Sequence, residues 1–66
     1  MEIQINGAAR TVPDNCTVAQ LIDTLGYAGK RVAIERNGDI VPRSAHAETV
    51  LTAADQIEIV VAVGGG

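Results

Sequence analysis

The 66-residue sequence has no phenylalanine and no tryptophan, and its single aromatic residue is Tyr27. Hydrophobic residues still make up 47% of the chain, so a folded core has to be assembled from aliphatic side chains. A domain of this size removes only about 60% of its unfolded surface from water, so the core must be compact. Because nucleic-acid modules stack bases on aromatic rings, the shortage of aromatics argues against that function.

Cysteine and histidine are equally scarce, since Cys16 and His46 each occur once. A lone cysteine cannot form an internal disulfide, and zinc sites and iron–sulfur clusters take about four ligands each. We therefore expect no bound metal and exclude iron–sulfur electron carriers. We expect Cys16 to be an inert apolar side chain, the alternative being a thioester or persulfide relay. For His46 we expect a surface or packing role, the alternatives being a partner contact or a proton shuttle.

Positive charge is also limited, because the formal net charge is −3. Proteins that bind nucleic acid or anionic membranes concentrate Lys and Arg on one surface, so neither partner is expected. No apolar stretch approaches about 20 residues and the start is not signal-like, so we expect a cytoplasmic protein. The five basic residues are scattered along the chain, at Arg10, Lys30, Arg31, Arg36 and Arg43.

The first half of the chain predicts a hairpin followed by a helix. "MEIQI" alternates apolar and polar residues, Asn6-Gly7 suits a tight hairpin turn, and a second strand through residues 10–12 ends at Pro13. Residues 18–25 form an amphipathic helix whose apolar face is Val18, Leu21, Ile22 and Leu25. A capping box at Thr17 and Gln20 marks its start, and Gly26 marks its end.

The second half predicts a second hairpin and a long last strand. In "RVAIERNGDIVPR", Val32 and Ile34 lie on one face of a strand, Asn37-Gly38 turns the chain, and residues 40–41 return before Pro42. Residues 43–54 are expected to form a loop or a single turn, with core contacts from Val50 and Leu51.

The last strand, "QIEIVVAV", has two unlike faces. Ile57, Ile59, Val61 and Val63 point one way, while Gln56, Glu58, Val60 and Ala62 point the other. Apolar surface therefore emerges on the second face, just before the glycines. We take Glu58, Val60 and Ala62 as a candidate docking face, with Arg43 as a further candidate contact. The alternatives are a face covered by the chain itself, and a plain solvated charge at Arg43.

Two hairpin-like pairs around one helix, in the order ββαββ, predict an α+β fold with the helix on one face of a mixed sheet. The first and last strands are expected to lie side by side. We expect the domain to span residues 1–63 and a flexible glycine tail to span 64–66.

The sequence resembles the ThiS family of ubiquitin-like, β-grasp sulfur carriers over nearly its whole length. The resemblance rests on "INGAARTV", "TVAQLI", "VAIERNGDIVPR", and "DQIEI" running into the terminal "GG". The "NGDIVPR" segment favours thiamin carriers over molybdopterin carriers. The sequence departs from the family at His46, where an aromatic, commonly Trp, is expected, and at Ala53-Ala54, where an Asp-Gly turn is expected. These departures concern local packing or a partner contact, and the geometry of the turn.

The resemblance implies that an ATP-dependent, ThiF-type enzyme adenylates the Gly66 carboxylate. The carboxylate is then converted to a thiocarboxylate with sulfur from a donor such as a cysteine desulfurase, for thiazole formation by a ThiG-type thiazole synthase. Gly65 and Gly64 provide access, because glycine lets another backbone approach closely. The sequence has no phosphate-binding Gly-x-x-x-x-Gly-Lys loop, so we expect a carrier with no bound cofactor rather than an enzyme.

Two other functions remain open at this point. A molybdopterin-type sulfur carrier would use the same tail chemistry with another acceptor. A ubiquitin-like modifier would join its Gly66 carboxylate to protein lysines. A disordered or inert end is the third interpretation of the glycines.

Overall fold

The computed structural model describes residues 1–62 of the chain. Predictions that fall on Val63 and on the glycines at 64–66 lie outside these described residues. The elements, in chain order, are β1 (Glu2–Ile5), β2 (Ala8–Thr11), α1 (Val18–Thr24), β3 (Val32–Arg36), β4 (Asp39–Val41), the 3-10 turn η1 (Arg43–Ala45) and β5 (Gln56–Val61).

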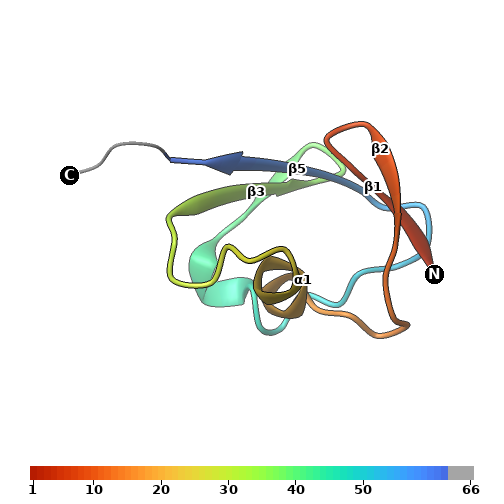
Figure 1. Ribbon diagram of the computed structural model, residues 1–66, viewed down its shortest axis with the longest axis horizontal. Coiled ribbons are helices and arrows are strands. Elements are labelled where there is room, and N and C mark those ends of the chain that lie inside the picture. Colours follow the sequence, from red (N-terminus) through yellow and green to blue (C-terminus); the bar gives the residue numbers. More distant parts are fainter. Residues whose placement is uncertain (63–66) are drawn as a thin grey trace.

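The strands form one sheet in the order β2-β1-β5-β3-β4, with α1 packed against one face (Figure 1). β1 and β5 pair in parallel and the other neighbours pair antiparallel, so the sheet is mixed. This is the predicted β-grasp arrangement, with the first and last strands side by side. The structure has one strand more than the predicted order ββαββ. The segment after the second turn, β4, pairs with β3 and is a strand in its own right.

Both Asn-Gly pairs make the turns that the sequence predicts. Asn6 and Gly7 have φ of 51° and 83°, and Asn37 and Gly38 have φ of 51° and 89°. Two consecutive left-handed residues give the twist that a two-residue hairpin needs, and Asn and Gly tolerate them best. β2 begins directly after the first turn, at Ala8, two residues earlier than the pattern predicted.

The helix matches its prediction to within one residue. The Thr17 hydroxyl accepts from the Gln20 N–H at 3.2 Å, and the Gln20 side chain accepts from the Thr17 N–H at 3.0 Å. The C-cap is Leu25, and Gly26 follows with φ of 81°. Among residues 1–62, no helix has the length and apolarity needed to cross a membrane.

The core between α1 and the sheet is aliphatic, as the composition requires. Val50 is the exception to the predicted core contacts, because it is 45% exposed while Leu51 is buried. Neighbouring residues of an extended segment point in opposite directions, so only one of the two could face inward. The buried apolar residues are Ile3, Val12, Cys16, Val18, Leu21, Ile22, Ile34, Leu51, Ile57 and Ile59.

The turn before β5 forms without the glycine that the family resemblance leads one to expect. Ala54 occupies it with φ of 70°, and its N–H donates to the Glu2 carbonyl at 2.9 Å. A left-handed conformation costs a residue with a Cβ roughly 1–2 kcal/mol. The geometry of the turn is therefore kept at the cost of local backbone strain.

Candidate functional site

The two faces of β5 differ as the alternation of its sequence predicts. Ile57 and Ile59 are buried against the core, whereas Glu58, Val60 and Ala62 are exposed. Val60 is 63% exposed, so the chain itself does not cover this face within residues 1–62. The predicted exposure is confirmed, and docking at these residues stays a prediction.

Neighbouring strands extend this face into a larger surface. The register of the antiparallel pairs places Ala33 opposite Val60, Glu35 opposite Glu58, and Ile40 opposite Glu35. Paired residues project to the same side of a sheet, so these side chains share the face that α1 leaves open. We call the set the open-face patch, and its members are Ala33, Glu35, Ile40, Glu58, Val60 and Ala62.

Sequence reasoning missed three members of the open-face patch. The alternation of "VAIER" already turns Ala33 and Glu35 away from the core, but it does not say which residue of β5 lies beside them. Ile40 is 67% exposed although it looked like an ordinary strand residue. Only the pairing register shows that it continues the patch.

The open-face patch also carries unbalanced negative charge. Glu35 and Glu58 are directly opposed, and within residues 1–62 neither forms an ion pair. Like charges at opposed positions weaken a strand pair by about 0.2–1 kcal/mol. A partner with an apolar contact surface and a basic group would bury Val60 and Ile40 and relieve this repulsion.

Arg43 lies away from the open-face patch. It begins η1 and lines a cavity with the helix residue Ile22, which places it on the helix side of the sheet. Pro42 ends β4 immediately before it, so the chain leaves the sheet at this point. The four residues predicted as docking contacts therefore lie on two separate surfaces.

The lone cysteine and the lone histidine are both buried. His46 is 9% exposed, and its Nε2 lies 3.2 Å from the Val41 carbonyl oxygen, so of the predicted surface or packing position the structure shows the packed one. Cys16 is 5% exposed and belongs to the core, as expected of an inert apolar side chain. No cluster of three or more His, Cys, Asp or Glu that could hold a metal is found in the part of the chain described.

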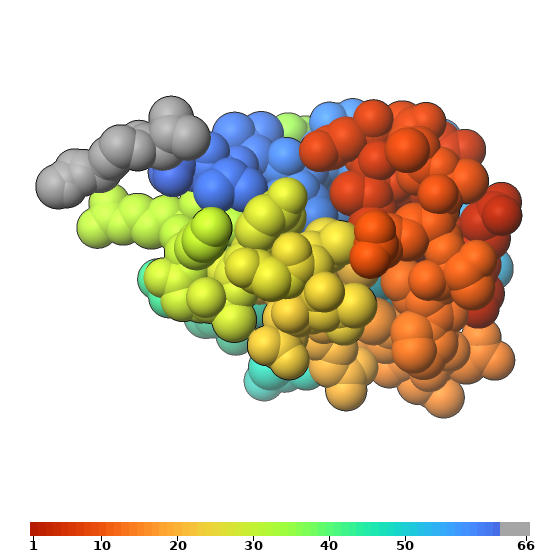
Figure 2. Space-filling view, viewed as in Figure 1, coloured from red at the N-terminus to blue at the C-terminus, as the bar shows by residue number. Residues whose placement is uncertain are grey.

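The end of β5 is held firmly where the glycines follow. Val61 is in register with Val32, and the Ala62 N–H donates to the Arg31 carbonyl at 2.9 Å. Figure 2 shows the blue end of β5 lying against the yellow-green segment that leads into β3. The predicted reactive residue Gly66 and the access residues Gly65 and Gly64 lie outside the described residues, so the structure fixes only the point from which they start.

Comparison with known proteins identifies the family that this arrangement matches. The sequence model of the ThiS family matches residues 3–66. A crystal structure of a thiamine biosynthesis protein (ThiS) from Geobacter metallireducens superposes with a TM-score of 0.84, at 30% identity and with 100% of both chains covered.

Two curated relatives are much longer than this chain. Proteins named thiazole synthase from Paramagnetospirillum magneticum and Magnetococcus marinus are 41% and 39% identical over all 66 residues. The chain spans only 20% of the length of each of these relatives.

Proposed function

This chain belongs to the ThiS family of sulfur carriers, and from this premise we propose that it carries sulfur for thiazole formation in thiamin biosynthesis. The observation that carries the proposal is the family match, which extends through the glycines to Gly66. The relatives named thiazole synthase favour thiazole over molybdopterin as the destination of the sulfur.

The chemistry that we propose takes place at the Gly66 carboxylate. A carboxylate oxygen is a poor leaving group, so a ThiF-type enzyme first transfers AMP from ATP to it and releases pyrophosphate. The outer sulfur of a persulfide on a donor such as a cysteine desulfurase then attacks the carbonyl carbon and displaces AMP, so that the C–O bond to the adenylate is replaced by a C–S bond. A thiol reductant cleaves the S–S bond of the resulting acyl disulfide with two electrons, which leaves the thiocarboxylate on the carrier and the donor as a thiol. Thiazole synthase accepts that sulfur.

The described part of the chain supports this proposal through β5. The strand is central in the sheet and is anchored up to Ala62, so the chain that follows starts from a rigid body. Four residues remain from there to Gly66. At 3.3–3.6 Å per residue they reach at most roughly 14 Å, which allows Gly66 to enter a channel while the domain stays outside. Gly65 and Gly64 have no Cβ to obstruct such a channel.

The partners follow from the same proposal. Two relatives named thiazole synthase contain a stretch that matches this whole chain, which supports thiazole synthase as the enzyme that receives the sulfur. The open-face patch is the surface that we assign to docking, because its exposed apolar side chains include Ala62, the last described residue before the glycine tail. We call this residue the root of the tail. Under this proposal the protein is a cosubstrate rather than an enzyme. It acts in the cytoplasm, where the activating enzyme uses ATP.

The test is the intact mass of the protein after incubation with ATP, a sulfur source and the activating enzyme of the same host. The full-length chain should gain the mass of an oxygen-to-sulfur exchange, mapped to Gly66. Deletion of Gly66 should leave the fold intact and lower adenylate formation by about 100-fold or more, because the carboxylate then stops one residue short of the reacting geometry.

The truncated chain is also the control for oxidation of Met1, which adds a similar mass and occurs in both proteins. Adenylate formation by the truncated chain at the full-length rate would contradict the proposal. The absence of both adenylate and mass shift in the full-length chain, with an enzyme that is active on its own carrier, would also contradict it.

A further inference from the structure

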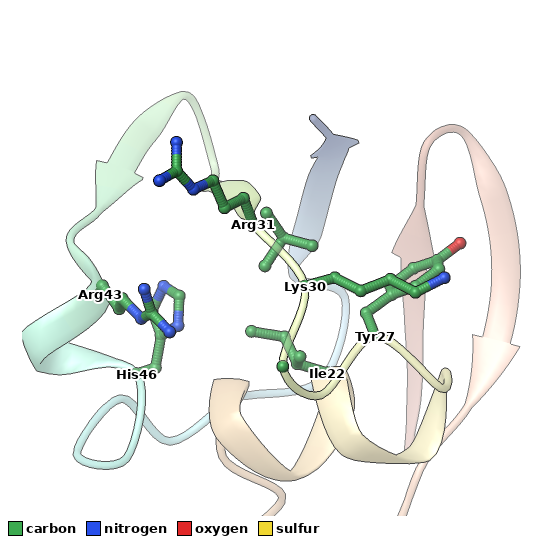
Figure 3. A pocket seen from close by; sticks show the side chains of 8 residues that line it. Ile22, Tyr27, Lys30, Arg31, Arg43 and His46 are labelled. Carbon is green, nitrogen blue, oxygen red and sulfur yellow. The ribbon is translucent and has the colours of Figure 1, made fainter. Parts of the chain in front are cut away.

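A second surface lies on the helix side of the sheet, close to the end of β5. A cavity of about 340 Å³ lies between the loop after α1 and η1. Its charged side chains are Lys30 and Arg31 from the loop and Arg43 from η1. Figure 3 shows Arg43 beside His46 on one side, Lys30 extended toward Tyr27 on the other, and Ile22 between them. We call it the cationic pocket, with apolar walls from Ile22, Tyr27 and Val32 and an exposed rim of Lys30, Arg31 and Arg43.

The charge of the cationic pocket is opposite to that of the protein as a whole. The chain has a formal net charge of −3, yet three of its five Lys and Arg residues line this one cavity, and no Asp or Glu lines it. Arg36 is paired with Asp55 at 2.8 Å, whereas Lys30, Arg31 and Arg43 make no ion pair with any residue from 1 to 62. Figure 3 shows these three side chains pointing in different directions around the cavity, so an incoming anion meets a cation from several sides and no acidic side chain of the lining.

The position of the pocket connects it with the tail. The Arg31 carbonyl accepts the hydrogen bond of the Ala62 N–H at 2.9 Å, so the pocket and the last described residue share a contact. The four residues after Ala62 span at most roughly 14 Å. An enzyme that holds Gly66 in its active site must therefore place its own surface next to this pocket.

We propose that the cationic pocket is a second docking surface, which receives a carboxylate-bearing segment of the enzyme that activates the tail. The inference rests on the proposed function, which supplies that enzyme. The apolar walls accommodate an aliphatic side chain of the segment, and the rim pairs with its Asp or Glu side chains. The enzyme thus contacts the root of the tail from both sides, since the acidic open-face patch lies on the opposite face of the sheet.

A protein carboxylate fits this pocket better than the phosphates of ATP do. The nucleotide must react with Gly66, at the far end of the tail, whereas the pocket lies at its root. The rim side chains are exposed and belong to two separate segments, as is common where a protein surface meets a partner. Opposed charges at such a rim mainly raise the rate of association and make it depend on salt.

The experiment compares three single charge reversals. Arg43→Glu and Lys30→Glu change the pocket. Arg10→Glu is the matched control, because Arg10 is exposed on β2, does not line the pocket, and makes no ion pair within residues 1–62. Affinity for the activating enzyme of the same host is measured by calorimetry at low and high salt, and adenylate formation is followed as a function of carrier concentration.

Both pocket variants should bind about tenfold more weakly than the unchanged protein and lose most of the salt dependence. In the kinetics, the effect should appear in KM, while kcat at saturating carrier stays close to that of the unchanged protein. Arg10→Glu should behave like the unchanged protein. The melting temperature shows whether each variant folds, and if Arg43→Glu does not, Lys30→Glu alone decides.

Binding of both pocket variants with unchanged affinity would overturn the proposal. An equal loss with Arg10→Glu would overturn it as well, because net charge rather than the pocket would then explain the effect. These results differ from a failure of the proposed function, in which the unchanged protein itself forms no adenylate with a competent enzyme.

Discussion

Asp55 is a buried carboxylate that anchors the start of β5. Its side chain is 6% exposed and accepts hydrogen bonds from the Thr52 N–H at 2.9 Å, the Thr52 hydroxyl at 2.9 Å, the Asn37 amide at 3.1 Å and Arg36 Nε at 2.8 Å. Burial alone would raise its pKa, but these hydrogen bonds outweigh it and lower the pKa from 3.8 to about 2. The ionised form is therefore an integral part of the fold.

This pKa predicts how stability falls in acid. Because the folded pKa lies below the unfolded one, the contribution is present in full above about pH 4 and is lost as pH falls toward 2. The free energy of unfolding should decrease by about 2 kcal/mol over this range. Urea titrations at a series of pH values measure it.

Asp55→Asn is the control for the acid prediction, since an amide has no proton to gain between pH 4 and 2. The variant should be less stable at neutral pH and should lack this part of the acid loss. If both proteins lose stability in parallel, the carboxylate of Asp55 is not the group responsible.

At the level of elements, the first hairpin is attached to β5 through a side chain. The Asn6 amide donates to the Ile59 carbonyl at 3.2 Å, and its oxygen accepts from the Ile59 N–H at 2.8 Å. The Asn6 side chain thus makes the two hydrogen bonds with β5 that the backbone of a further β1 residue would make. In the second turn, Asn37 similarly accepts from the Gln56 N–H at 2.9 Å, so both turn asparagines hold the central strand.

Asn6→Gly tests the contribution of this side chain, because glycine keeps the left-handed turn and removes both hydrogen bonds. We expect a loss of about 1–3 kcal/mol, at roughly 0.5–1.5 kcal/mol for each bond. Chemical denaturation measures the loss. Asn6→Asp should lie between the two proteins, since it can accept from Ile59 but cannot donate to it. A stability of Asn6→Gly equal to that of the unchanged protein would show that water replaces the amide without loss.

The elements could be predicted because their signals are local. The Thr17-Gln20 capping box, the Asn-Gly turns and the alternation of β5 each depend on residues a few positions apart. The side-chain role of Asn6 was missed because Ile59 lies 53 positions further along the chain. The opposition of Glu35 and Glu58, and the gathering of Lys30 with Arg43, likewise arise only when distant segments pack together. Val50 and Leu51 could not be told apart from the sequence either. The alternation of side chains along an extended segment does not say which of two neighbouring residues faces inward.

On the scale of the whole molecule, the sheet separates two surfaces of opposite charge. The acidic and apolar open-face patch lies on one side, and the cationic pocket lies with α1 and η1 on the other. In Figure 1, the sheet lies above α1, and the end of β5 lies beside the start of β3. A partner that surrounds this end meets both kinds of charge, which fixes the orientation of the carrier.

The docking role of the open-face patch predicts the behaviour of Val60→Asp. Val60 is 63% exposed, so the change should cost no more than about 1 kcal/mol of stability and leave the protein folded. The KM of the activating enzyme for the carrier should rise about tenfold. The reason is that an apolar contact is lost and a third acidic side chain is added beside Glu35 and Glu58. Adenylate kinetics and the melting temperature give the two measurements.

Ala9→Asp provides the matched comparison for Val60→Asp. Ala9 is exposed and in register with Gln4, on the same face of the sheet but on the strand furthest from Ala62 on that side. It should leave activation unchanged. Equal losses from both variants would refute a localised docking surface, and an unfolded Val60→Asp would show that Val60 belongs to the core.

The central position of β5 has a mechanical consequence. A pull on the chain beyond Ala62 runs along the axis of a strand that is bonded to β1 on one side and β3 on the other. The hydrogen bonds of both ladders then share the load in shear and do not open one after another like a zipper. An enzyme can therefore draw the end of the chain in, and the carrier can be pulled out again after transfer, without unravelling the domain to which that end is attached.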